Sequence, residues 1–283
     1  MTFIRPKPIY TVAKKEFIDN IRNKWIIILT MLFVILIIAF SYVAGGQTGD
    51  DTFGNMQNTV FGLLGISSLL IPLIAIILGF STISGEAETG SLYVVLSYPI
   101  KRIEVLIGKL LGLGAVISLS VLLGFGFGGI IIAITVGTES FQGYLAFILL
   151  SIFIGLIYLS LSICISSYCK RRITSIGGGI VIFFWSIIYG TVIIAVFLGA
   201  GYEFSDFMRG NIPDWFFNSV ILSPSDMYQT TVQRAFDVKT IETAGFSVSI
   251  PEFLSLPVLL IAQFIWFIIP LVIAYFLFKR RDI

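Results

Sequence analysis

Residues 52–85 read TFGNMQNTVFGLLGISSLLIPLIAIILGFSTISG, a stretch of 34 residues without one charged side chain. An α-helix needs about 20 residues to cross the hydrocarbon core of a bilayer. Five more charge-free runs have at least 25 residues each: Trp25–Gly49, Leu110–Thr138, Ser140–Cys169, Ile173–Tyr202 and Phe253–Phe278. The first run is longer than the core of a signal peptide, which has about 7–15 residues, so we expect it to be an uncleaved span.

The composition of the whole chain agrees with these runs. Of its 283 residues, 57% are hydrophobic and 12% are charged, against about 45–50% and about 25% in soluble domains. The mean hydropathy is +1.00. We therefore predict an all-α polytopic membrane protein that forms a single transmembrane domain over residues 1–283. The expected spans lie near 25–44, 59–83, 104–136, 142–169, 173–200 and 257–278.

The distribution of charge predicts how the spans are oriented. If six spans alternate, 15 of the 18 basic residues fall on one side of the membrane. The other side holds Arg209, Arg234 and Lys239, together with ten of the 16 acidic residues. Because basic loops stay in the cytoplasm, both termini are expected there. Nothing in this pattern points to nucleic acid, since topology and lipid headgroups account for the basic residues.

Several kinds of chemistry lack their usual residues. The chain contains no GxxxxGK[ST] phosphate loop; Lys109 follows Gly108, but Ile103 stands where the first glycine would be. It has no histidine and no carboxylate in the middle of a span, which argues against catalysis and against an ion-driven carrier. Cys164 and Cys169 lie on different faces of one predicted helix. We expect no enzyme activity, no metal and no cofactor in this chain.

Polar residues within the spans are interpreted as helix–helix hydrogen-bonding groups rather than as a pathway lining. They are Ser67, Ser68, Tyr158, Ser160, Ser162, Tyr189 and Gln263. Two small-xxx-small pairs in the third span, Gly108/Gly112 and Gly124/Gly128, indicate close helix packing. We favour packing within the chain over a dimer seam at these glycines.

A short segment of mixed character, GEAETGSLYVVLSYPIKR at residues 85–102, joins the second and third spans. Gly85 is expected to end the span and Pro99 to end a short helix. Glu86 and Glu88 would lie at the positive end of that helix. Its apolar residues, Leu92, Tyr93, Val95 and Leu96, could contact either lipid or a cytosolic partner.

The pattern G-E-x-E-x-G-S-L-x-x-x-L-S-x-P-I-x-R-x-E-x-x-x-G-K, from Gly85 to Lys109, resembles the permeases of the second exporter class of ABC transporters. It is similar to the subgroup of nitrous-oxide-reductase maturation, sodium-efflux and bacitracin-resistance permeases. The resemblance implies that segment 84–103 contains a cytoplasmic coupling helix that docks on an ATPase subunit. Its docking face would be Leu92, Tyr93, Val95 and Leu96, with Pro99 ending the helix and Glu86, Glu88, Arg102 and Lys109 framing the face.

Within residues 1–24 and the start of the first span, residues 9–25 are expected to form an amphipathic interfacial helix. Ile9, Ala13, Phe17, Ile21 and Trp25 recur every four residues, and the charged side chains lie away from this stripe. The segment is similar to the elbow helix of the same permeases. A membrane anchor and an ATPase contact are both consistent with it.

The loop at residues 201–256 is expected outside the cell and contains LSPSDMYQTTVQRAF. Ser223 fits an N-cap, Pro224 the first helical position and Asp226 the third, which predicts a helix over about 224–236. The sequence LSPSD also resembles that of the permeases, in which outer helices close the exit. The simpler expectation is a structural lid, and the alternative is a docking site for an outside partner.

Together these features predict the permease subunit of an ATP-driven exporter in a prokaryotic cell membrane. The resemblance implies two cytosolic ATPase subunits, which would hold ATP and Mg²⁺, and a second copy of this chain or a related permease. The alternative is a membrane scaffold or assembly factor that transports nothing. The sequence does not identify the cargo.

Overall fold

The computed structural model describes residues 5–46, 56–203, 205–206, 212–238, 240–243 and 246–281. Arg209 and Lys239 lie outside these ranges. The elements are α1 (Pro6–Ile21), α2 (Lys24–Gly46), α3 (Met56–Gly79), α4 (Ser84–Glu88), α5 (Ser91–Ser97), α6 (Arg102–Thr135), α7 (Phe141–Tyr168), α8 (Arg172–Gly199), α10 (Asp214–Ser219), the 3-10 helix η1 (Val220–Leu222), α11 (Pro224–Ala235), β1 (Thr240–Thr243), β2 (Phe246–Ser249) and α12 (Leu256–Arg280).

Six helices in the described part of the chain are long and apolar enough to cross a membrane: α2, α3, α6, α7, α8 and α12. The predicted fold class is therefore confirmed. Two details differ from expectation. Helix α3 already ends at Gly79, and Gly85 lies inside the separate helix α4. An antiparallel hairpin, β1–β2, adds a small strand pair to the loop before α12.

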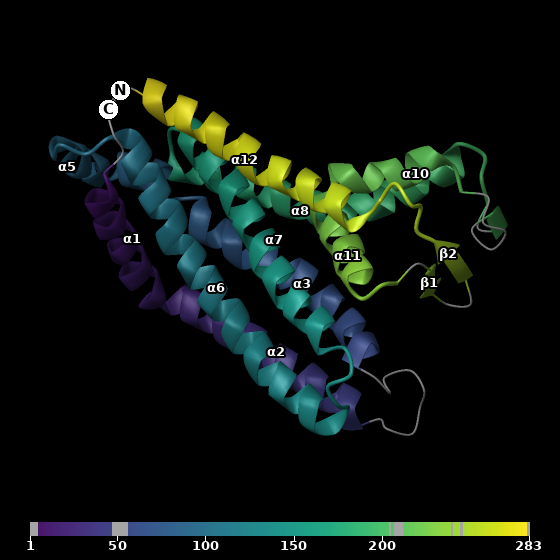
Figure 1. Cartoon of the computed structure of the whole chain (residues 1–283). Helices are drawn as coiled ribbons and strands as arrows, with labels where there is room; N and C mark the ends of the chain where they lie inside the picture. The colour runs from purple at the N-terminus through teal and green to yellow at the C-terminus, as the bar shows by residue number, and fades with distance from the viewer. Residues whose placement is uncertain are drawn as a thin grey trace.

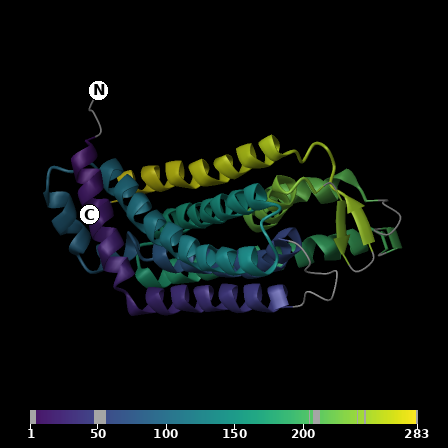
Figure 2. The ribbon, with the colours of Figure 1, turned by 60° about the horizontal axis from the view of Figure 1, so that its bottom comes forward.

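The long helices run side by side, and α7 packs against α3, α6, α8, α11 and α12 (Figures 1 and 2). Both termini and helix α5 lie at one end of the bundle, which we call the basic end (Figure 1). Helix α10 and the hairpin lie at the opposite end, which we call the loop end (Figure 1). This arrangement places the segment between α3 and α6 beside the two termini.

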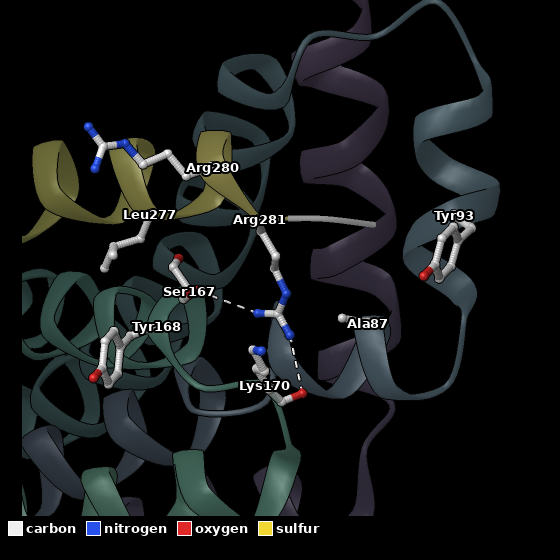
Figure 3. A pocket seen from close by; sticks show the side chains of 8 residues that line it. All are labelled: Ala87, Tyr93, Ser167, Tyr168, Lys170, Leu277, Arg280 and Arg281. Atoms are coloured by element: carbon white, nitrogen blue, oxygen red, sulfur yellow. Dashed lines mark hydrogen bonds between the residues drawn. The ribbon is translucent and has the colours of Figure 1, made fainter.

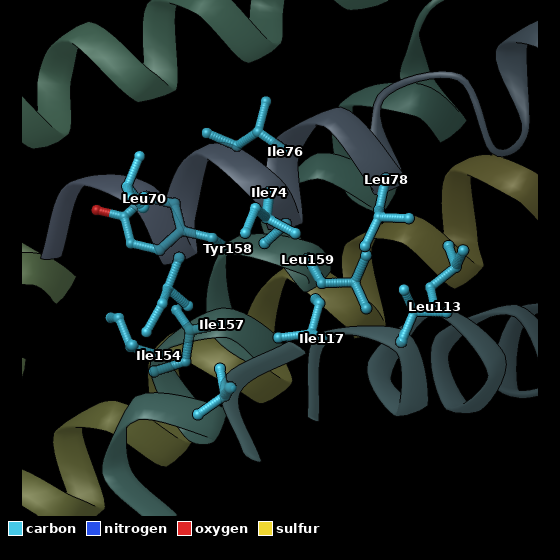
Figure 4. Packing of buried hydrophobic residues seen from close by; sticks show 14 of the residues in the cluster. Leu70, Ile74, Ile76, Leu78, Leu113, Ile117, Ile154, Ile157, Tyr158 and Leu159 are labelled. Carbon is cyan, nitrogen blue, oxygen red and sulfur yellow. The ribbon is translucent and has the colours of Figure 1, made fainter. Parts of the chain in front are cut away.

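The core forms where α3, α6 and α7 meet. Ile71, Ile117 and Ile154 are each at most 1% exposed, and they belong to one continuous apolar cluster. Figure 4 shows Ile117 and Ile154 within it. Gly155 lets α7 approach closely, because a Cβ there would lie 2.6 Å from a methyl carbon of Ile117. The bundle is thus centred on α7, with α8 and α12 leaving many of their apolar side chains uncovered.

The glycine pairs of α6 pack within the chain, as the sequence indicated. A Cβ on Gly124 would lie 2.5 Å from the Phe33 ring, and one on Gly128 would lie 2.7 Å from Ile37, so α2 lies directly on this stretch of α6. The Phe33 ring also meets Phe125 edge to face, with centroids 5.4 Å apart. The first pair, Gly108 and Gly112, faces α1 instead.

Candidate functional site

The segment between α3 and α6 folds as two short helices rather than one. Helix α4 ends at Glu88, and Gly90 has a φ of 76°, in the left-handed region that glycine adopts without strain. Helix α5 then runs from Ser91 to Ser97. Tyr98 takes the extended backbone conformation that a following proline imposes, so Pro99 ends the helix as predicted.

The apolar side chains of α5 divide between the core and the surface. Leu92 is fully buried, and Val95 and Leu96 are half-buried against the core cluster. The exposed ones are Tyr93, Val94 and Tyr98, with exposed fractions of 55%, 62% and 62%. Of the four residues assigned to a docking face, Tyr93 is exposed, Val95 and Leu96 are partly exposed, and Leu92 is buried. Leu92 was misplaced because its i, i+3, i+4 relation to Val95 and Leu96 is equally typical of a face that packs inward.

The acidic residue at the start of this segment enters a buried ion cluster. The Lys109 ammonium lies 2.7 Å from Glu16 Oε1 and 2.8 Å from Glu86 Oε2, and the Lys109 side chain is only 2% exposed. Lys15 Nζ lies 3.4 Å from Glu86 Oε1. Burial by itself would lower the pKa of Lys15, but Glu86, Glu16 and Asp19 outweigh it and raise that pKa. The cluster joins α1, α4 and α6.

Helix α1 touches α6 backbone to backbone beside the cluster. A Cβ on Gly112 would lie 2.5 Å from the Ala13 carbonyl oxygen, and one on Gly108 would lie 2.7 Å from Val12. The buried residues of α1 are Val12 and Glu16, which lie off the predicted stripe. The stripe residues Ile9, Ala13 and Phe17 are half-buried beside them, whereas Ile21 and Trp25 are exposed.

The predicted helix over residues 9–25 is therefore corrected at both ends. Helix α1 begins at Pro6 and ends at Ile21, so Trp25 belongs to α2 and is 73% exposed. Regular i+4 spacing identified the helix but not the face that packs. Val12 and Glu16 are buried because the glycines of α6 let this side of α1 approach closely. The inward position of an acid was hidden from the sequence, since its partner Lys109 lies 93 residues away.

A second buried acid organises the start of α6. Glu104 Oε2 accepts a hydrogen bond from the Lys101 amide at 2.9 Å, and Glu104 Oε1 accepts one from the Arg5 amide at 2.9 Å. The Arg5 guanidinium pairs with Glu104 and also donates to the Pro99 carbonyl. The chain before α1 is thus tied to the end of the α4–α5 segment.

Two arginines donate to the carbonyl ends of other helices. Arg102 of α6 donates to the carbonyls of Phe278, Lys279 and Arg281, at 2.5–2.9 Å. Arg281 in turn donates to the carbonyls of Ser167 in the last turn of α7 and of Lys170 just after it (Figure 3), and also to that of Cys169. Helix C-termini carry partial negative charge and unpaired carbonyls, which a guanidinium satisfies. Arg102 therefore holds α12 to α6 through its Nη1 atom.

Glu88 accepts a hydrogen bond at a helix N-terminus, which carries partial positive charge. Its Oε2 accepts a hydrogen bond at 2.6 Å from the Arg172 amide, the first residue of α8. Nearby, Ser166 of α7 accepts hydrogen bonds from the amides of Ile83 and Ser84, each at 3.0 Å. The α4–α5 segment is consequently bonded to α1, α6, α7 and α8.

At the loop end, the helix predicted over 224–236 forms as α11, Pro224–Ala235, and Ser223 caps it by accepting from the Asp226 amide. Its position differs from that of an exposed lid. Tyr228 is fully buried and lies within hydrogen-bonding distance of Ser151 in α7 and Ser67 in α3, at 2.7 and 3.1 Å. Helix α11 is therefore a wedge between the spans (Figure 1).

Most of the polar residues within the spans form hydrogen bonds to another helix, as the sequence predicts. Tyr158 lies 2.7 Å from Ser225 of α11, and Gln263 of α12 donates to Thr231 of α11. Tyr189 donates to the Ser219 carbonyl of α10, and Ser162 to that of Ile76 in α3. Ser68 and Ser160 donate only to carbonyls of their own helices. Sequence reasoning found these groups but not that three of them, Ser67, Tyr158 and Gln263, bond to α11.

Comparison with known proteins places these features in a family. Residues 10–283 match the family described as ABC-2 family transporter protein. A protein of Stutzerimonas stutzeri named probable ABC transporter permease protein NosY is 26% identical over 282 residues, covering 96% of this chain and 98% of its own length. A protein of the same name from Pseudomonas aeruginosa is 28% identical over 285 residues, covering 97% of this chain and 99% of its own length.

Proposed function

The chain belongs to the ABC-2 transporter family, and from that premise we propose that it is the permease subunit of an ATP-driven exporter. Its two relatives carry the name of ABC transporter permeases over nearly their full lengths. Six helices of spanning length support a place in the membrane. The finer parts of the proposal are a separate cytosolic ATPase in two copies, which binds ATP and Mg²⁺, and a second copy of this chain or a related permease.

One observation carries the coupling role. The α4–α5 segment presents an exposed apolar surface of Tyr93, Val94 and Tyr98, while Glu86 and Glu88 fix its base to α1, α6 and α8. A surface of this kind accepts a partner, and a rigid base passes the partner's movement to the spans. We propose that the ATPase docks on these three side chains at the cytoplasmic face of a prokaryotic cell membrane.

The test is an affinity pull-down of the tagged full-length protein from its native membranes in mild detergent. We expect a near-stoichiometric soluble ATPase to co-elute. Tyr93→Asp combined with Val94→Asp should lose the ATPase while the permease still inserts, because both side chains are exposed. Leu222→Asp is the matched control, since Leu222 is 59% exposed at the loop end.

If no ATPase elutes under conditions that preserve a known ABC complex, the exporter proposal fails and a non-transporting scaffold replaces it. If the ATPase co-elutes equally well with the double variant, the proposed ATPase partner stands and the proposed docking residues are wrong. Substitution of Leu92 would not separate these outcomes, because Leu92 is buried and a charge there would disturb the core.

A further inference from the structure

The loop end contains a cavity of about 220 Å³ between α8, α10 and α11. One part of its wall is apolar and aromatic, formed by Ile193, Ile194 and Phe216. The other part is polar, with the side chains of Gln229, Thr230 and Asp226. Mixed walls of this kind are typical of small-molecule sites, in which a few polar groups orient an otherwise apolar ligand.

Asp226 is the charged group of this cavity. Its Oδ2 atom is buried and accepts no hydrogen bond from the part of the chain that the structure describes. No described lysine or arginine lies within ion-pair distance of it. The nearest basic residue along α11, Arg234, donates to the carbonyls of Ile250, Pro251 and Leu254 instead. A buried carboxylate without a cation is unfavourable, and a ligand that supplies one gains the difference.

The surroundings favour a positive ligand as well. Segment 201–256 contains seven acidic and three basic residues, so a cation is attracted to this end and an anion is repelled. Tyr189 and Phe216 both line the cavity, and aromatic faces attract organic ammonium groups. The apolar helix α8 would accept the hydrocarbon part of such a ligand.

We propose that this cavity binds a small organic cation, with its charged group against the Asp226 carboxylate and its apolar part against α8. Asp226 is then a binding residue in addition to its place in the first turn of α11. A role for the bound cation as exported cargo rests on the function proposed above, whereas the binding itself does not.

The test uses the full-length protein in nanodiscs of zwitterionic lipid, and the probe is radiolabelled benzyltrimethylammonium in a scintillation proximity assay. We expect saturable binding that excess unlabelled probe displaces and that neutral benzyl alcohol and anionic phenylacetate do not. Asp226→Asn keeps the shape and removes the charge, so it should weaken binding by at least about tenfold. Asp214→Asn is the control, because Asp214 lies on α10 outside the cavity lining, and it should bind as the wild type does.

Thermal unfolding distinguishes lost binding from lost folding. Without ligand, Asp226→Asn should unfold at the same or a higher temperature than the wild type. Equal binding by the wild type and Asp226→Asn, or no saturable binding by a folded wild type, overturns the proposal. Cross-linking that places a second copy's side chain against Asp226 overturns it too. The assay contains neither ATP nor ATPase, so failure of the exporter proposal leaves its result readable.

Discussion

Lys109 connects three separate elements through one side chain. It is 2% exposed, and its ammonium contacts Glu16 of α1 and Glu86 of α4. Removing one partner of a buried ion pair costs about 3–5 kcal/mol, because the other charge stays buried and unpaired. In this cluster Lys15 Nζ would still lie 3.4 Å from Glu86 Oε1 and 3.9 Å from Glu16 Oε1, which places the cost near the lower part of that range.

We therefore expect Lys109→Met to lower the unfolding temperature of the detergent-solubilised protein by several degrees and to reduce its yield. Lys14→Met is the matched control, because Lys14 is an exposed lysine of α1. Adding Glu16→Gln and Glu86→Gln to Lys109→Met should restore much of the lost stability. An unchanged unfolding temperature in Lys109→Met would show that the cluster does not hold the basic end together.

The charge of Asp226 lowers the stability of the folded protein, whereas the charge of Lys109 raises it. Burial raises the pKa of its carboxyl, and the Ser223 hydroxyl and the Asp226 amide offset this only in part. The folded state therefore holds the proton at a higher pH than the unfolded chain does. The free energy of unfolding should fall as pH rises from the usual value of about 3.9 through the raised pKa of Asp226.

This prediction is checked by measuring unfolding temperatures of the wild type and Asp226→Asn across that pH range. The difference between them should grow in favour of Asp226→Asn as the wild-type carboxyl ionises. Tyr158 and Tyr189 are titratable neighbours of Asp226, and their phenols titrate only near pH 10 in water. Parallel curves for the two proteins would contradict the assigned burial.

At the scale of elements, α1 and α6 show how backbone contact depends on glycine. A Cβ on Gly112 would lie 2.5 Å from the Ala13 carbonyl oxygen, which is backbone and cannot rotate away. Gly112→Ala should therefore push α1 off α6 and speed tryptic cleavage after Lys14 and Lys15, because a loosened helix unfolds locally more often. Gly126→Ala on the same helix meets nothing within 4 Å and serves as the control. Equal cleavage rates for both variants would mean that α1 is held by its side chains alone.

The sequence predicted where the helices lie along the chain better than it predicted the contacts between them. Apolar run lengths located all six long helices, and Ser223, Pro224 and Asp226 located α11 to within one residue at each end. These signals act over a few residues. The depth of α11 depends on Tyr228 meeting Ser67 and Ser151, which are 161 and 77 residues away. The burial of Lys109 depends on partners equally remote, so local patterns could not reveal either.

Turn chemistry explains the remaining error in the α4–α5 segment. Its two glycines have different roles, and only Gly85 was predicted to end a helix. Gly85 is helical within α4, whereas Gly90 has a positive φ and separates α4 from α5. The docking residues Leu92 and Tyr93 were assigned to one face, but adjacent residues of an α-helix point about 100° apart, and Leu92 is buried while Tyr93 is exposed. Only tertiary packing decides which side is buried.

For the whole molecule, the two ends are stabilised by different forces. The basic end has the Lys109 ion cluster and the arginine caps of α7 and α12. The loop end has neutral hydrogen bonds between α11 and the spans, such as those of Tyr228 and Tyr158. Neutral hydrogen bonds between membrane helices contribute only about 0.6 kcal/mol on average. We therefore expect α11 to separate from the spans more readily than the α4–α5 segment does.

Hydrogen–deuterium exchange of the full-length protein in nanodiscs tests this difference. Tyr228→Phe combined with Ser225→Ala removes side-chain hydroxyls that bond α11 to α3 and α7, while the apolar contacts of α11 remain. Exchange should rise in peptides of α11 and leave those of α1, α4 and α5 unchanged. Lys109→Met should produce the reverse pattern, with faster exchange in α1 and α4 alone. If either variant accelerates exchange at both ends, the bundle transmits the disturbance through α7, and the ends are not separately stabilised.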